Sequence, residues 1–82
     1  MTHILGIHIQ SRTEEVPDVQ PILTRYGCNI KTRIGLHDAT EQVCSPSGII
    51  LLEIFGDASV LAEMRDKLNA IPGVSTKTMT FP

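Results

Sequence analysis

Histidine and cysteine are the side chains of this sequence best suited to hold a transition metal. The chain has three histidines and two cysteines, and such metals prefer imidazole nitrogen and thiolate sulfur as ligands. His37 and Cys44, joined by His8 or His3, form the best candidate ligand set. Their spacing contains no HxH or CxxC pair that would pre-form a chelate. Metal binding is therefore an alternative hypothesis, and the first expectation is a protein without a cofactor.

Four polar residues form a second candidate site for a ligand or an interface. If strict strand alternation holds, His8, Arg33, His37 and Glu53 share one face of a sheet. His8 and Glu53 would lie on adjacent central strands, with Arg33 on the strand beyond. Such a cluster could bind a ligand between subunits, or it could be a buried ion pair that fixes the subunit register. The residues alone leave both alternatives open, and a purely structural association module without a ligand is a further alternative.

The sequence has no recognisable catalytic arrangement. Cys28 and Cys44 form no Cys–His pattern of fixed spacing, which nucleophilic catalysis would need for activation of the thiol. Glu41 is a lone carboxylate in a polar segment. The glycines are spread between elements and form no glycine-rich phosphate-binding loop. We therefore expect a protein that is not an enzyme.

These residues must be positioned by six elements, whose types follow from apolar periodicity. Spacings of three and four predict helices, and short alternating or continuous apolar runs predict strands. The expected order is strand, helix, strand, strand, helix, strand, over residues 3–10, 14–26, 28–38, 48–56, 57–71 and 74–81. Residues 39–47 are expected to form a polar loop. The order βαββαβ predicts one α+β, ferredoxin-like domain over residues 1–82, with two helices on one face of a four-stranded antiparallel sheet.

The apolar run at residues 48–56 lacks a cover on one of its faces. One alternating set of this strand can face the helices, which leaves Ile49, Leu51 and Phe55 with Ile4 of the neighbouring strand on the open side. An exposed apolar patch of this kind marks an association surface. The simplest cover is the same face of a second copy. We expect a homo-oligomer, a dimer or a tetramer, that assembles through its sheet faces.

Composition excludes several classes of protein. The net charge is −2 among 82 residues and the pI is about 5.8, which argues against direct nucleic-acid binding because a binder needs a basic surface. No apolar run approaches the ~20 residues that span a bilayer, so no membrane association is expected. The N-terminus has no basic region or cleavage site of a secretory signal. We expect a cytoplasmic protein with two free thiols.

Three stretches together resemble a known family. They are residues 32–37 (Thr-Arg-Ile-Gly-Leu-His), residues 49–53 (Ile-Ile-Leu-Leu-Glu) and residues 68–78, which contain Ile-Pro-Gly-Val. Nearly the whole chain resembles the iron-only hydrogenase system regulator family, which consists of small ACT-like bacterial proteins. The resemblance implies a regulatory role. ACT-like domains pair through their sheets and bind small effectors at subunit interfaces, which implies a small-molecule effector or a partner protein.

The resemblance also bears on the metal hypothesis. The C-terminal domain of the nickel-responsive repressor is similar in topology and binds nickel through His and Cys ligands between subunits. By that likeness His37 and Cys44 would take nickel or zinc. This chain lacks the HxH pair on that strand, and Cys44 precedes the third strand in our prediction. It also carries no ribbon-helix-helix element, so the resemblance implies that any effect on transcription passes through a partner protein.

Overall fold

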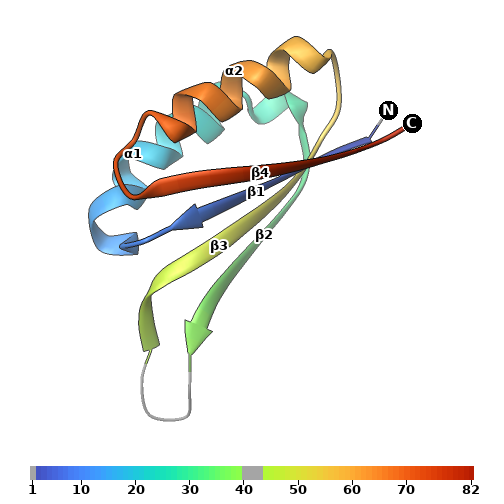
Figure 1. Ribbon diagram of the computed structural model, residues 1–82. Coiled ribbons are helices and arrows are strands. Elements are labelled where there is room, and N and C mark those ends of the chain that lie inside the picture. The colour runs from blue at the N-terminus through green and yellow to red at the C-terminus, as the bar shows by residue number, and fades with distance from the viewer. Residues whose placement is uncertain (1, 40–43) are drawn as a thin grey trace.

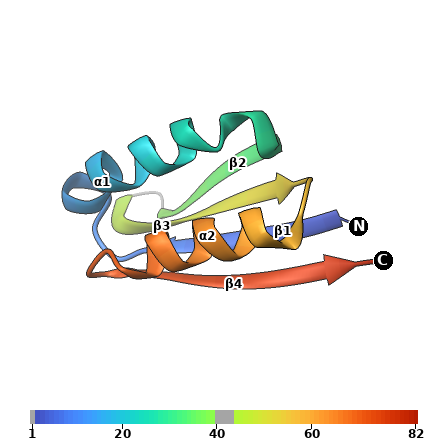
Figure 2. The same cartoon turned by 90° about the horizontal axis from the view of Figure 1, so that it is seen from above.

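The fold is a two-layer α+β structure, a ferredoxin-like βαββαβ arrangement, as predicted. The computed structural model describes residues 2–39 and 44–82, apart from the side chains of residues 12, 13, 15, 16, 36–39 and 44–46. The sheet is antiparallel with strand order β2-β3-β1-β4, and both helices lie on one of its faces (Figures 1 and 2). The elements are β1 (Thr2–Ile9), α1 (Arg12–Arg25), a 3-10 turn (Gly27–Asn29), β2 (Ile30–Ala39), β3 (Cys44–Ile54), α2 (Ala58–Asn69) and β4 (Val74–Phe81).

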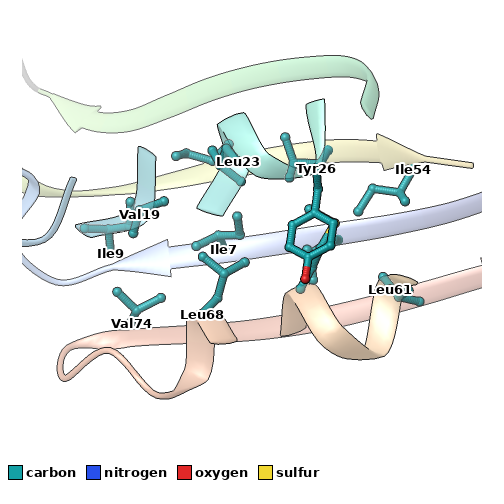
Figure 3. Close-up of a cluster of buried hydrophobic side chains, with 13 residues drawn as sticks. Ile7, Ile9, Val19, Leu23, Tyr26, Ile54, Leu61, Leu68 and Val74 are labelled. Atoms are coloured by element: carbon teal, nitrogen blue, oxygen red, sulfur yellow. The ribbon is translucent and has the colours of Figure 1, made fainter. Parts of the chain in front are cut away.

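The hydrophobic core fills the space between the helices and one face of the sheet (Figure 3). β1 and β3 lie in the middle of the sheet and supply alternate side chains to the core, as a period of two requires. The helices supply side chains at spacings of three and four. Fully or nearly buried members are Leu5, Ile7, Ile9, Val19, Leu23, Tyr26, Ile50, Leu52, Ile54, Leu61, Met64, Leu68 and Val74.

Several element boundaries differ from the sequence prediction, and those of α1 and β3 matter most for the site. Helix α1 begins at Arg12, two residues before the predicted start, and includes Pro17 and Pro21 as one α-helix. Strand β3 begins at Cys44, so part of the predicted loop is strand, and Cys44 pairs with Ala39 across the β2–β3 hairpin. The remainder of that predicted loop, residues 40–43, lies outside the described part of the chain. Among the described residues no helix is both long enough and apolar enough to span a bilayer.

An irregularity near the start of β2 changes which of its side chains face the helices. Ile30 pairs with Ile54, but Thr32 pairs with Glu53, which directly precedes Ile54 in the antiparallel strand β3. Two steps along β2 therefore match one step along β3, which is the pattern of a β-bulge. Before the bulge, Ile30 packs against the core. After it, Thr32 and the residues in phase with it belong to the opposite face of the sheet.

The junction between β3 and α2 depends on a glycine with an unusual backbone. Gly56 has φ of 114°, a conformation that side chains with a Cβ rarely adopt. A Cβ at this position would lie 2.8 Å from Asn29 Nδ2. Asn29 in turn donates from Nδ2 to the Phe55 carbonyl oxygen at 3.1 Å and accepts the Phe55 N–H at its own carbonyl at 3.0 Å. The glycine thus allows two chain segments to approach closely.

Candidate functional site

The candidate site is the open face of the sheet, the side away from the helices. The ladder aligns Gly6 with Leu51 and Lys77, and His8 with Ile49 and Ser75. Several large apolar side chains remain accessible in and around this face: Ile34 is 49% exposed, Ile49 41%, Phe55 49%, Met79 57% and Phe81 53%. The helices of the described chain lie on the other side (Figure 2). An apolar surface of this kind is typical of an interaction site.

The four polar residues predicted to share this face do not form one cluster. Arg33 pairs with Leu52 in the ladder, and its Nη1 donates to Oε1 of Gln20 on α1 at 3.2 Å. Arg33 therefore lies on the helix side, and that part of the prediction is wrong. The cause is the β-bulge, which inverts the alternation beyond Lys31 and places Ile34 on the open face instead.

Glu53 lies on the open face as predicted, but its partners belong to its own chain and were not foreseen. Thr32 Oγ1 donates to Glu53 Oε1 at 3.1 Å, and Lys31 Nζ lies 3.9 Å from Oε2. The Glu53 side chain is 31% exposed, so this pair is partly screened by water. The carboxylate is therefore satisfied by the edge strand β2, and neither Arg33 nor His8 contacts it among the described interactions.

His8 borders a hollow on the open face that sequence reasoning missed. The hollow has a volume of about 340 Å³ and is lined by Gly6, His8, Ile49, Ser75, Lys77 and Thr76. Its place follows from Gly6, which leaves a gap in a row of side chains between Leu51 and Lys77. The sequence did contain a signal, because a glycine inside a strand often marks a gap or a close approach.

The histidines predicted as metal ligands do not converge in the described structure. His3 is only 2% exposed and its Nδ1 lies 3.0 Å from Thr80 Oγ1, on the core side of the sheet, whereas His8 is exposed on the other side. The ladder places His37 opposite Gly48. The side chains of His37 and Cys44 lie outside the described part, so a site built on them stays a prediction. Among the side chains that are described, no group of three His, Cys, Asp or Glu residues could hold a metal.

A family model matches residues 2–78 and carries the description "Iron-only hydrogenase system regulator, putative", with the name TM1266-like. The chain belongs to the TM1266-like family. The family description is that of a regulator, which agrees with the role that the sequence resemblance implied.

One solved structure supports the same assignment, and a second shares only the fold. The TM1266 protein of Thermotoga maritima is 25% identical, with a TM-score of 0.84 over 99% of this chain and 96% of that one. A formyltetrahydrofolate deformylase from Pseudomonas putida KT2440 is 19% identical, with a TM-score of 0.60 over 99% of this chain and 29% of that one, and this likeness concerns the fold alone. A search of curated proteins found no match.

Proposed function

We propose that this TM1266-like protein is a regulatory module that acts as a homo-oligomer, with the open sheet face as the contact between copies. The single observation that carries the proposal is the set of exposed apolar side chains on this face. Ile34, Ile49 and Met79 come from three different strands, and each keeps between 41% and 57% of its surface accessible. Burial of such side chains is the main favourable term in protein association.

The size of the domain supports a second copy as the cover. A chain of 82 residues has a limited core, and small domains often gain stability by association. A two-fold axis would bring the same patch against itself, so the complementary surface would already be present in the second copy. Mutual burial would remove both apolar faces from water at once.

The regulatory effect would then pass through a small effector or a partner protein of the hydrogenase system. The family description supports the hydrogenase link. The acidic net charge of −2 supports a mechanism without direct nucleic-acid contact, because phosphate neutralisation requires a basic surface. The regulatory signal would be a change in the oligomeric state, or in the exposed face, when the effector binds.

The test is the molar mass in solution, measured by light scattering after size exclusion at micromolar protein. We expect an oligomer for the wild type and a monomer for Ile49→Glu, since the charge would be buried in an apolar interface. Ser59→Glu is the matched control, because Ser59 is exposed at the start of α2 and away from the sheet face. A wild type that runs as a monomer would overturn the proposal.

A further inference from the structure

We propose that the hollow over Gly6 binds a small molecule that carries a carboxylate on an apolar body. The hollow lies on the open face, so this inference rests on the proposed regulatory function for its biological meaning and deepens it by naming the effector class. Its physical basis is separate, because it depends on the shape and charge of this hollow and not on the contact between copies.

The shape of the hollow is set by the missing side chain at Gly6. A Cβ built there would meet Leu51 Cδ2 at 3.6 Å and the Lys77 carbonyl oxygen at 3.7 Å, which are ordinary contact distances. The hollow is therefore lined by the backbone of Gly6 and the aliphatic side chain of Ile49, and Leu51 lies next to the glycine. The volume of about 340 Å³ lies within the range of about 300–1,000 Å³ typical of small-molecule sites.

The charge around the hollow favours an anion. Lys77 Nζ carries a positive charge, and the His8 ring can donate a hydrogen bond. Neither side chain has a hydrogen-bond or ion-pair partner within the described structure. No acidic residue lines the hollow, and Glu53, the acid of the neighbouring strand, is already bound by Lys31 and Thr32.

A carboxylate fits the residues that line the hollow better than a phosphate does. The residues that line the hollow include one cationic residue, Lys77, together with His8 and Ser75. Phosphate sites usually gather several cations or backbone N–H groups. The apolar part of the lining, Gly6 and Ile49, would instead receive the hydrocarbon part of the ligand, as in other small-molecule sites with few polar groups.

The experiment titrates 4-methylpentanoate into isotopically labelled full-length protein and follows backbone amide resonances, with 4-methylpentanamide as the uncharged matched compound. We expect shifts at Gly6, His8, Ile49 and residues 75–77 at millimolar carboxylate, and binding of the amide weaker by about tenfold or more. Lys77→Gln should weaken carboxylate binding by about tenfold, and Lys31→Gln, a cation lost from the opposite edge strand, should not.

Gly6→Val tests the shape independently, because it fills the hollow with a residue that suits a strand. We expect loss of carboxylate binding with a retained fold, and if this variant fails to fold, Lys77→Gln and the amide comparison still decide. Equal binding of carboxylate and amide, or no binding to the wild type, would overturn the proposal.

The oligomeric mass of each variant separates this inference from the proposed assembly. We expect Lys77→Gln and Glu53→Gln to keep the wild-type mass while only Lys77→Gln loses the ligand. If both variants instead dissociate, the occupant of the hollow is the Glu53 carboxylate of a second copy, and the small-ligand proposal is wrong while the assembly stands.

Discussion

Substitution of Gly56 by alanine tests the tightest junction of the fold. The positive φ of 114° costs a residue with a Cβ about 1–3 kcal/mol. The new Cβ would also lie 2.8 Å from Asn29 Nδ2 and would displace the hydrogen bond to the Phe55 carbonyl, a loss of about 1 kcal/mol. Reduced freedom of the unfolded chain returns about 0.4–1 kcal/mol. We therefore expect Gly56→Ala to lower the free energy of unfolding by about 2–3 kcal/mol.

Urea and thermal denaturation at a fixed protomer concentration measure this loss, since association makes the midpoint concentration-dependent. For a domain of this size the melting temperature should fall by about 10–20 °C. Gly27→Ala is the matched control, because a Cβ there meets nothing within 4 Å and Gly27 has no positive φ, so its effect should stay within about 0.5 kcal/mol.

A double-mutant cycle separates the two causes. In an Asn29→Ala background the side-chain clash is gone, so Gly56→Ala should cost only the backbone strain, and the difference from the wild-type background is the coupling between the two positions. If Gly56→Ala and Gly27→Ala have the same melting temperature, neither the strain nor the contact with Asn29 affects stability, and the reasoning is refuted.

Three further predictions concern the contact between the two helices, the open face of the sheet and the metal hypothesis. Tyr26→Phe removes the bond from Tyr26 Oη to Glu63 Oε2, 3.1 Å long, and should cost about 0.5–1.5 kcal/mol in urea unfolding; an unchanged midpoint would contradict this. Ile34→Glu should break the proposed oligomer while Arg33→Glu should keep it, because the bulge puts these neighbours on opposite faces. Molar masses from light scattering that show the opposite pattern would contradict this prediction. EDTA should leave the melting temperature unchanged, whereas nickel stabilisation that His37→Ala abolishes would favour the metal-sensor alternative over our proposal.

The elements and their order could be predicted from the sequence because apolar periodicity and strand number leave few arrangements. The alternation of Leu5, Ile7 and Ile9 and the helical spacing of Leu61, Met64 and Leu68 correspond to the buried positions. Local pattern and topology agreed, and such agreement is what a foldable sequence requires.

The site could be predicted only in part, because side-chain direction depends on an unbroken register. The bulge between Ile30 and Thr32 contains no glycine or proline from which it could be predicted. It nevertheless places Arg33 on the helix side of the sheet and Ile34 on the open face. The same shift makes Thr32, and not Arg33, the neighbour of Glu53. One extra residue in a ladder is enough to exchange the two faces of a strand.

The pairing of β1 with β4 has a consequence for how the protein folds. β1 lies in the middle of the sheet, and its Thr2 pairs with Phe81 of the last strand (Figure 1). During folding, β1 can pair with β3 before it pairs with β4, the last strand of the sheet in sequence order. Until β4 docks, one edge of β1 stays unpaired, and such an edge can pair with other chains. A chain in which β4 has not yet docked is therefore prone to aggregation, and docking of β4 along β1 removes that exposed edge.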